Sequence, residues 1–410
     1  MAVTAPTGCA ASVVRGSTYH SYLGVATGDR RAYAPRGGRA LDEARLRMRG
    51  VDYIFMDEIS MVSCQDLYLI DKRLKDVTTL EDMPFGGLSI IVAGDFAQLP
   101  PARGLSLYSG EVSKVQRPRQ SQTDQENTLG LLLWNLFVTV VVLRQNMRQT
   151  NTSDAAEDSL RTCLEHMRYK DCTEADLEFL RSRIPSNNPA LNLGDPMWCD
   201  VSVITAWNTH KDQINAMNAI RFARENNRPL HMFYSVDRQG RGKGRVRQKP
   251  ARDTNEPKIR LTPAVQEALW RSPPIPANTY PHVYHYVLGQ EAVVKGWTSQ
   301  EIPGFPGRFA LEVLFVKLVN PKDNIKLPHL EENVVPLTRM STALRAVLPN
   351  DAGIHISRQQ VPVLLNFAMT DYASQGKTRE VNVVDLLRSR NHQAMYTALS
   401  RGTSAASTII

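Results

Sequence analysis

Two short apolar runs, each followed by acidic residues, constrain the fold more than any other feature. Residues 53–56 (YIFM) precede Asp57 and Glu58, and residues 90–93 (IIVA) precede Asp95 after one glycine. Strands that are buried on both faces of a parallel sheet are apolar throughout rather than alternating. Ligands of such sheets bind beyond the carboxyl ends of the strands. The two runs therefore predict a parallel sheet with acidic residues at its ligand-binding edge.

Further apolar runs alternate with helical stretches along the chain. Residues 155–168 predict a helix. The additional predicted strands are residues 138–143 and the runs within DVSVITAWN (200–208), VPVLLNFAM (361–369) and EVNVVDLL (380–387). This alternation predicts an α/β fold.

Two segments interrupt the alternation. Residues 236–260 are polar and rich in Gly, Arg and Lys, which predicts a loop or an insertion. Residues 280–340 carry strand-like runs separated by Pro and Gly, which predicts a small all-β insert. Within the first segment, residues 238–252 contain seven Lys or Arg and no acid. That basic run is a candidate for electrostatic contact with a DNA strand, and a solvated loop is an equal alternative.

The composition permits a nucleic-acid partner without requiring one. The 410 residues include 49 Lys and Arg against 41 Asp and Glu, a net charge of +8. The five cysteines contain no C-x-x-C pair, which argues against a zinc site and for a reducing compartment. No apolar run reaches the length of a membrane span, and no signal peptide is visible. We therefore expect an intracellular protein.

The tripeptide Gly376-Lys377-Thr378 matches the end of a phosphate-binding loop, but the rest of the pattern is absent. The pattern G-x-x-x-x-G-K-[ST] requires a glycine five residues before Gly376, where this chain has Asp371. No other stretch of the sequence fits the pattern. We therefore expect the tripeptide to do a different job.

Seven blocks of sequence resemble, in their order, the Pif-type DNA helicases of superfamily one and the related helicase regions of rolling-circle transposons. The blocks are TAPTGCAA, GSTYHS, YIFMDEISM, GDFAQLPP, LRQNMRQT, SQGKT and YTALSRGTS. The resemblance implies two RecA-like α/β domains of the P-loop NTPase type, the first one incomplete. It implies that they bind ATP and Mg²⁺ and move 5′ to 3′ along single-stranded DNA.

The resemblance also implies a division of the chain and a cellular setting. Residues 1–145 would form the first domain, residues 146–200 a helical connector, and residues 201–410 the second domain with the basic segment and the β-rich insert. The expected roles are DNA repair, recombination or telomere maintenance in the nucleus or mitochondrion. A transposon-encoded helicase region is the alternative.

Five residues take catalytic roles under this resemblance. Asp57 would hold Mg²⁺, and Glu58 would orient or deprotonate the attacking water. Gln98 would sense the γ-phosphate through its amide. Arg148 and Arg401 would contact the γ-phosphate from the second domain, because a guanidinium fork matches phosphate oxygens.

Simpler interpretations of these residues stay open. The acidic pair could be a solvated turn, the glutamine an ordinary loop residue and Arg401 a surface arginine. Arg144 competes with Arg148 for the same role. A metal nuclease would also use acidic strand ends, but the sequence lacks the further acidic and histidine ligands of a two-metal site.

The SQGKT block would join the nucleotide to DNA. Gln375 and Gly376 would lie nearest the nucleotide. The residues expected to contact DNA are Thr4, Thr7, His20, Ser374, Lys377 and Thr378, through hydroxyl and backbone contacts that read no sequence. The family carries a His-Lys pair before the serine, whereas this chain has Tyr372 and Ala373. One contact of the family is therefore missing, and Lys377 is expected to replace it in part.

The leading interpretation is the body of a helicase whose first strand and phosphate loop lie on the order of 30 residues upstream of the TAPTG block. The alternative is a non-enzymatic remnant that binds single-stranded DNA. Because the loop normally holds the β- and γ-phosphates and Mg²⁺, the chain of 410 residues alone is expected to hydrolyse ATP barely or not at all.

Overall fold

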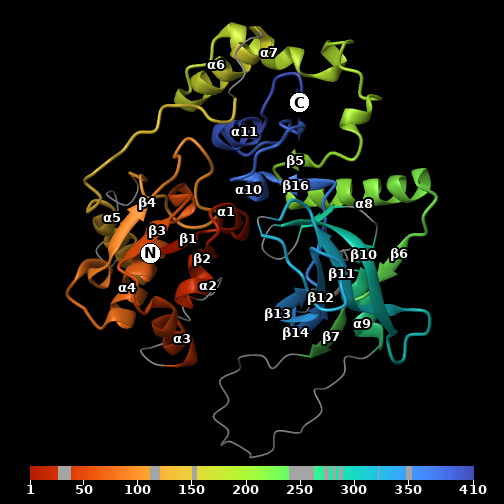
Figure 1. Ribbon diagram of the computed structural model, residues 1–410, viewed down its shortest axis with the longest axis horizontal. Helices are drawn as coiled ribbons and strands as arrows, with labels where there is room; N and C mark the ends of the chain where they lie inside the picture. Colours follow the sequence, from red (N-terminus) through yellow and green to blue (C-terminus); the bar gives the residue numbers. More distant parts are fainter. Residues whose placement is uncertain are drawn as a thin grey trace, which may run out of the picture. The chain divides into compact units, whose positions relative to one another are not determined.

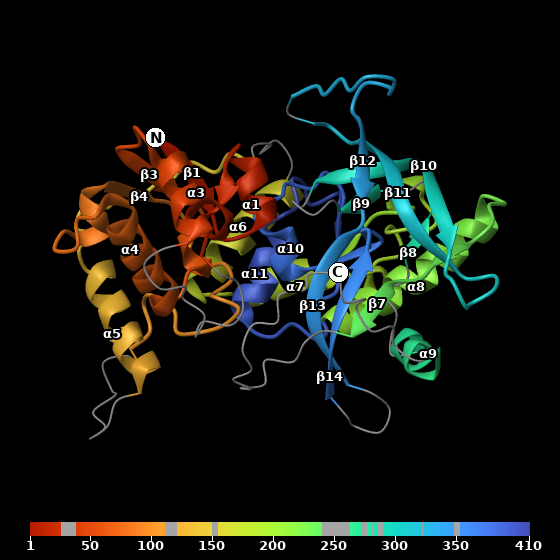
Figure 2. The same cartoon turned by 90° about the horizontal axis from the view of Figure 1, so that it is seen from below.

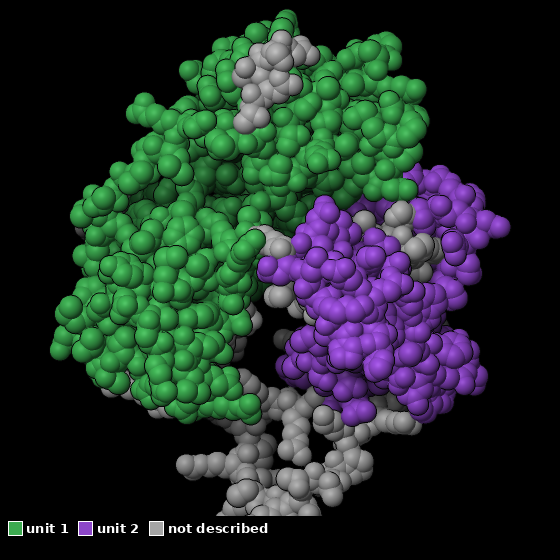
Figure 3. Space-filling model, in the orientation of Figure 1, with its two compact units in different colours: residues 1–211, 369–410 green, residues 212–368 purple. Residues whose placement is uncertain are grey.

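The computed structural model divides into two compact units. It describes residues 1–25, 38–110, 121–149, 155–239, 263–271, 277–279, 283–285, 290–321, 323–347 and 353–410. Unit 1 comprises residues 1–211 and 369–410, and unit 2 comprises residues 212–368 (Figure 3). None of the described helices is long and apolar enough to cross a membrane. The predicted division at residues 145 and 200 stays a prediction.

The first sheet of unit 1 is parallel, as the two apolar runs predict. Its strands follow the order β2-β1-β3-β4 (Figure 1). They are β1 (Ala2–Ala5), β2 (Ser17–Thr18), β3 (Tyr53–Met56) and β4 (Ser89–Val92). The helices and 3₁₀ turns beside them are α1 (Gly8–Val13), α2 (Tyr19–Leu23), α3 (Arg39–Met48), η2 (Ile59–Met61), α4 (Cys64–Thr78), η3 (Pro84–Gly87) and α5 (Gln122–Trp134).

Helix α4 packs against this sheet through its apolar face. Ser63 caps the helix, because its hydroxyl accepts from the Asp66 amide while the Asp66 side chain accepts from the Ser63 amide. Leu67 and Ile70 on the buried face pack with Ile54 of β3 in one core cluster. Burying a side chain of this size contributes about 1.5–3 kcal/mol.

The second sheet of unit 1 is built from the C-terminal half of the chain. Its order is β16-β5-β17-β18, and β17 is parallel to both of its neighbours. The strands are β5 (Val203–Thr205), β16 (Ala368–Thr370), β17 (Asn382–Val384) and β18 (Thr408–Ile409). The accompanying elements are α6 (Ala155–Tyr169), α7 (Glu174–Ser182), η5 (Pro185–Asn187), η6 (Pro196–Trp198), α10 (Asp371–Ser374) and α11 (His392–Leu399). Leu160, Ile204 and Leu399 join one buried core, which fixes α6 and α11 to the sheet.

Unit 2 is rich in antiparallel strands, as predicted for residues 280–340. Helix α8 (Asn208–Glu225) leads into it. One sheet has the order β15-β9-β10-β11-β6-β8 with β12 beside β11, and a second has the order β13-β14-β7 (Figure 2). The elements are β6 (His231–Phe233), β7 (Val236–Gln239), α9 (Pro263–Arg271), β8 (Ala277–Thr279), β9 (Val283–His285), β10 (Glu291–Glu301), β11 (Phe309–Leu318), β12 (Val334–Thr338), β13 (Met340–Val347), β14 (Gly353–Gln360) and β15 (Leu364–Leu365).

Two predictions of local structure need correction. Residues 138–143 form no strand, and Val138 and Leu143 are 86% and 90% exposed. A strand needs a partner for its backbone groups, and β4 ends its sheet without a further strand among the described residues. Residues 236–239 form strand β7 rather than a loop, because they pair with β14. The remainder of the basic run, residues 240–252, lies outside the described residues.

Candidate nucleotide site

The carboxyl end of β3 positions the predicted acidic pair. Glu58 is 8% exposed and adopts a left-handed backbone with φ +53°. A non-glycine residue in this region is strained, and such strain collects at functional sites. Asp57 Oδ1 accepts from the Glu58 amide at 2.9 Å. Burial raises the pKa of both carboxyls, and for Glu58 the bond from Gln375 opposes this shift.

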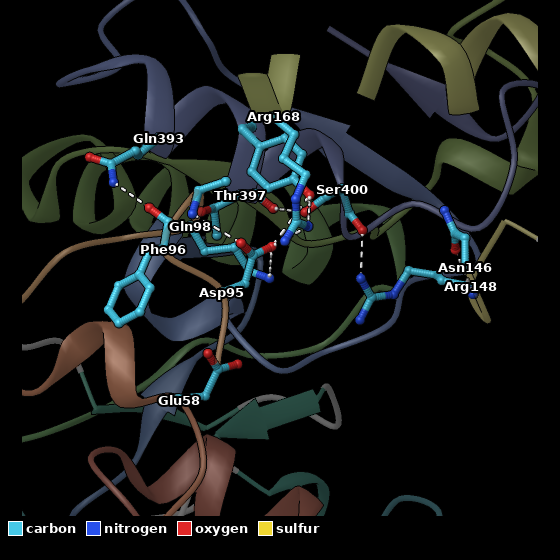
Figure 4. Close-up of polar contacts among 12 residues, drawn as sticks. Glu58, Asp95, Phe96, Gln98, Asn146, Arg148, Arg168, Gln393, Thr397 and Ser400 are labelled. Carbon is cyan, nitrogen blue, oxygen red and sulfur yellow. Dashed lines mark hydrogen bonds and ion pairs between the residues drawn. The ribbon is translucent and has the colours of Figure 1, made fainter. Parts of the chain in front are cut away.

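The loop after β4 carries Asp95 and Gln98. Asp95 Oδ1 accepts from the Ala97 amide at 2.9 Å, and its Oδ2 accepts from Gln98 Nε2 at 3.3 Å. Gln98 Oε1 in turn accepts from Arg401 Nη2 at 3.0 Å (Figure 4). The glutamine amide therefore links the acidic loop of the first sheet to an arginine of the second.

Arg401 is a buried cation. Its side chain donates to the Thr397 carbonyl at 2.9 Å and to Ser400 Oγ at 2.8 Å, and the residue is 1% exposed. Burial, with repulsion from Arg148, lowers the pKa of Arg401 to about 10. In the described part of the chain no carboxylate forms an ion pair with it. A buried charge without such a partner is costly, so the position suits a bound anion.

Arg148 lies beside Arg401 in the same cluster. Its Nη1 donates to the Ser400 carbonyl at 2.8 Å (Figure 4). Its Nε donates to Thr378 Oγ1 at 3.1 Å. Burial lowers the pKa of this arginine also. The competing Arg144 is exposed. The geometry thus favours Arg148 over Arg144 for the role beside Arg401.

The glutamine and glycine of the SQGKT block reach Glu58. Gln375 is fully buried, and its Nε2 donates to Glu58 Oε2 at 2.8 Å. Its Oε1 has no hydrogen-bond partner among the described groups. Gly376 has φ +80°, and a Cβ there would lie 3.9 Å from Glu58 Oε1. The tripeptide that resembles a phosphate loop therefore lies against the buried carboxylate.

Several residues that support this cluster were not predicted. Arg168 Nη1 donates to Asp95 Oδ2 at 2.9 Å, and the Tyr396 hydroxyl lies 3.5 Å from the same oxygen. Asn146 Oδ1 accepts from the Arg148 amide at 2.9 Å, while Gln149 donates through its side chain to the Gly402 carbonyl. Tyr396 lies within the YTALSRGTS block, so the block itself was a signal. Asn146 and Gln149 lie likewise within the LRQNMRQT block, whereas no local pattern points to Arg168.

Two residues that are predicted to contact DNA have buried hydroxyls. Thr4 is 1% exposed, and its hydroxyl donates to the Phe55 carbonyl at 3.1 Å. Ser374 is fully buried, and its hydroxyl donates to the Asp371 carbonyl at 2.7 Å. Both hydroxyls bond backbone carbonyls within unit 1. Contact of these two residues with DNA stays a prediction.

The other predicted DNA contacts lie at or near the surface. Thr7 caps α1 by accepting from the Ala10 amide, and His20 is half-buried and stacks on Tyr19. Lys377 is half-buried, and Thr378 is exposed apart from its bond with Arg148. Their contacts with DNA stay predictions.

The acidic pair fits a magnesium ion only together with phosphate. Among the described residues, no group of three or more His, Cys, Asp or Glu side chains is placed to hold a metal. Mg²⁺ usually keeps several waters and binds through one or two carboxylates plus substrate phosphates. Asp57, half-buried at the carboxyl end of β3, offers the one carboxylate that such a site needs.

The fold and the cluster define the class of RecA-like α/β proteins. Residues 1–168 match the family described as PIF1-like helicase. A crystal structure of Bacteroides Pif1 bound to ssDNA is similar with a TM-score of 0.61 and 18% identity, covering 100% of this chain and 82% of that one. The Pif1 helicase of Candida albicans gives a TM-score of 0.60 at 20% identity, covering 100% and 83%. These identities support the fold alone.

Proteins of known name are similar to the chain in sequence as well. The human ATP-dependent DNA helicase PIF1 is 24% identical over 406 residues, 98% of this chain and 52% of that protein. The ATP-dependent DNA helicase Pif1 of Bdellovibrio bacteriovorus is 40% identical over 103 residues, 25% of this chain and 23% of that protein. The chain is thus similar to proteins named as Pif1 helicases. It spans about half or less of the length of these relatives.

Proposed function

We propose that this chain forms the body of an ATP-dependent DNA helicase that moves 5′ to 3′ along single-stranded DNA. The observation that supports this most is Arg401, which is buried without a described ion-pair partner. A γ-phosphate would supply the missing negative charge, and a hydrogen bond from a guanidinium to a phosphate oxygen is charge-assisted. The arginine lies in one cluster with Glu58 and Gln98, the residue types that water activation and phosphate sensing need.

Each residue of the cluster has a distinct task in hydrolysis. Glu58 orients the attacking water and accepts its proton, and its raised pKa makes it a stronger base than an exposed glutamate. Gln375 donates to Glu58 and holds its rotamer. Arg401 and Arg148 stabilise the charge that develops on the transferred phosphate. Asp57 would hold a Mg²⁺ ion that binds together with the nucleotide, and such an ion would neutralise phosphate charge.

The relatives support the substrate. The relatives are named ATP-dependent DNA helicases, and one similar structure contains single-stranded DNA. Direction, roles in repair, recombination or telomere maintenance, a transposon origin, and a nuclear or mitochondrial location stay predictions from the resemblance.

A second function is favoured by one feature of the sequence. The 410 residues contain no match to G-x-x-x-x-G-K-[ST]. Without a loop that cradles the phosphates, the arginines lack a fixed γ-phosphate on which to act. A protein that binds single-stranded DNA without hydrolysing ATP would fit the absence of the phosphate-loop motif.

The test is a DNA-stimulated ATPase assay on two proteins. One is the chain of 410 residues, and the other is the chain extended upstream through its reading frame, hereafter the extended form. We expect turnover in the extended form only, and we expect Glu58→Gln to abolish it. Equal turnover by both proteins would refute the argument about the loop. An inactive extended form that binds single-stranded DNA would favour the second function.

A further inference from the structure

Three side chains from the second sheet of unit 1 form a stack outside the nucleotide site. Trp207 follows β5, Tyr372 follows β16, and Arg390 follows β17. The Arg390 guanidinium carbon lies 4.8 Å from the Trp207 ring centroid and 5.5 Å from the Tyr372 ring centroid. The cation thus lies against both aromatic rings, within the range of a cation–π contact.

Hydrogen bonds fix this stack in place. Trp207 Nε1 donates to the Arg388 carbonyl at 2.9 Å, and Arg390 Nη2 donates to the Ala206 carbonyl at 2.7 Å. The Tyr372 hydroxyl donates to the Pro100 carbonyl at 3.1 Å. The indole is therefore held in one orientation, and ordering it on binding would cost little entropy.

The indole is nevertheless open to solvent. Trp207 is 45% exposed. A tryptophan that is fixed by its donor and backed by a guanidinium offers a flat apolar surface. Nucleic-acid bases stack on such surfaces whatever their identity, because every base has a π face.

The charges around the stack suit a polyanion. Arg388 is exposed, and its Nη1 lies 3.0 Å from His210 Nε2. Lys211 lies on the same first turns of α8. Two acids are close: Asp385 accepts from Thr205 Oγ1, and Asp371 is buried beneath Arg390. Asp371 is buried and Asp385 is half-buried, whereas Arg388 and Arg390 are exposed. Asp212, which follows Lys211 on α8, is an exposed acid.

We propose that the stack of Trp207, Arg390 and Tyr372 is a platform on which one base of single-stranded DNA stacks. The proposal rests on the proposed function and deepens it by naming a contact on the second sheet. Tyr372 occupies part of the position where the related helicases carry a His-Lys pair. Arg390 brings a cation to that place from a different strand, so the platform supplies what the sequence there lacks.

The test measures the binding of a fluorescein-labelled oligo(dT) by the 410-residue chain at several salt concentrations. We expect Trp207→Ala to weaken binding about tenfold, within the range measured for single base–aromatic stacks. The slope of log affinity against log salt should stay unchanged, because no charge is removed. Trp207→Phe should restore most of the affinity, since phenylalanine keeps a π face.

A matched control separates stacking from general damage. Trp297 in β10 is 37% exposed and also packs on aromatic neighbours, so Trp297→Ala should leave oligo(dT) binding unchanged. Unchanged melting temperatures would show that the variants fold. In the wild-type chain, indole emission should be quenched by oligo(dT), and Trp207→Phe should lose part of that quench.

Three outcomes would overturn the platform. Wild-type affinity in Trp207→Ala would refute it while leaving the proposed function intact. Quenching of Trp207 by ADP but not by oligo(dT) would assign the ring to a nucleotide base instead. No binding of oligo(dT) by the wild-type chain would refute strand binding by this chain and the platform with it.

Discussion

The two sheets of unit 1 differ in the charges that follow their strands. The carboxylates of Asp57, Glu58 and Asp95 follow the first sheet, whereas the second sheet leads both to acids, Asp371 and Asp385, and to the cations Arg388 and Arg390. Hydrolysis of a phosphate needs a carboxylate to handle water and cations to receive charge. In the candidate site, Glu58 follows the first sheet and Arg401 belongs with the second, so the chemistry depends on the contacts that join the two sheets.

A second difference concerns solvent. Glu58 and Arg401 are buried in the nucleotide cluster, but Arg388 and Trp207 are exposed. Charges that water does not reach interact strongly and respond little to salt, whereas exposed charges are screened. We therefore expect nucleotide chemistry to depend on single buried groups and strand binding to be spread over several weak contacts.

The largest expected effect follows from removing the buried cation. In the extended form, Arg401→Ala should lower DNA-stimulated turnover by about 10³-fold or more, the range reported for arginines that stabilise phosphoryl transfer. Arg401→Lys should recover little, because an ammonium cannot reproduce the planar fork. Turnover is measured at saturating oligo(dT). Arg388→Ala serves as the control, and a comparable loss in that variant would break the distinction between buried and exposed cations.

A smaller effect is expected where the two sheets are joined through Asp95. Arg168→Ala removes the 2.9 Å bond to Asp95 and frees the loop that positions Gln98. We expect kcat to fall about tenfold with little change in KM, since Arg168 touches no candidate ligand and a misplaced group of this kind costs catalysis. Arg168→Lys should recover part of kcat. A change in KM alone would instead indicate direct contact with the nucleotide.

Sequence reasoning found the chemical groups but not their supports. Asp57 and Glu58 were predictable because an apolar run fixes where a buried strand ends. Arg168 was missed because its contact with Asp95 joins residues 73 positions apart, which no local pattern encodes. Thr4 was assigned to DNA because its hydroxyl is suitable, yet burial is set by the neighbouring strand. Sequence gives donor types, whereas packing decides which donors face a ligand.

The same limit explains the wrong strand at residues 138–143. The run VTVVVL has the composition of a buried strand. Composition predicts that a segment can join a sheet, but joining requires a neighbour with free backbone groups. The described residues place no strand beyond β4, and the run stays exposed.

Burial of Glu58 predicts a stability that depends on pH. Because the folded state raises the pKa of this carboxyl, it holds the proton more tightly than the unfolded chain does. Its stabilising contribution is therefore present at low pH and lost as the pH rises through the folded pKa. Glu58→Gln should remove that loss and raise the melting temperature at pH 8 by about 2–4 °C, the shift expected for 1 kcal/mol in a domain of this size.

The control for this prediction is Glu174→Gln, which changes an exposed glutamate in the same unit. At pH 5 and again at pH 8, the melting curve of Glu174→Gln should coincide with that of the wild-type chain. The increase in melting temperature that Glu58→Gln gives over the wild-type chain should be larger at pH 8 than at pH 5. A benefit that is equal at both pH values would mean that the buried carboxyl is not the titrating group.

The smallest expected effect concerns the exposed cations of the second sheet, and it distinguishes the two sheets most directly. Arg388→Ala removes one cation beside Trp207 but keeps the backbone carbonyl that accepts from the indole. If Arg388 neutralises one phosphate of a single strand, the slope of log affinity against log salt should become shallower by about 0.7. At 0.15 M salt the affinity for oligo(dT) should fall only about two- to threefold, because exposed ion pairs contribute less than about 1 kcal/mol. Fluorescence anisotropy at four salt concentrations measures both quantities.

The same titration on Arg45→Ala, which removes an exposed arginine from α3 beside the first sheet, should give the wild-type slope. Equal slopes for Arg388→Ala and wild type would show that the strand does not follow the cationic end of the second sheet, whatever Trp207 does.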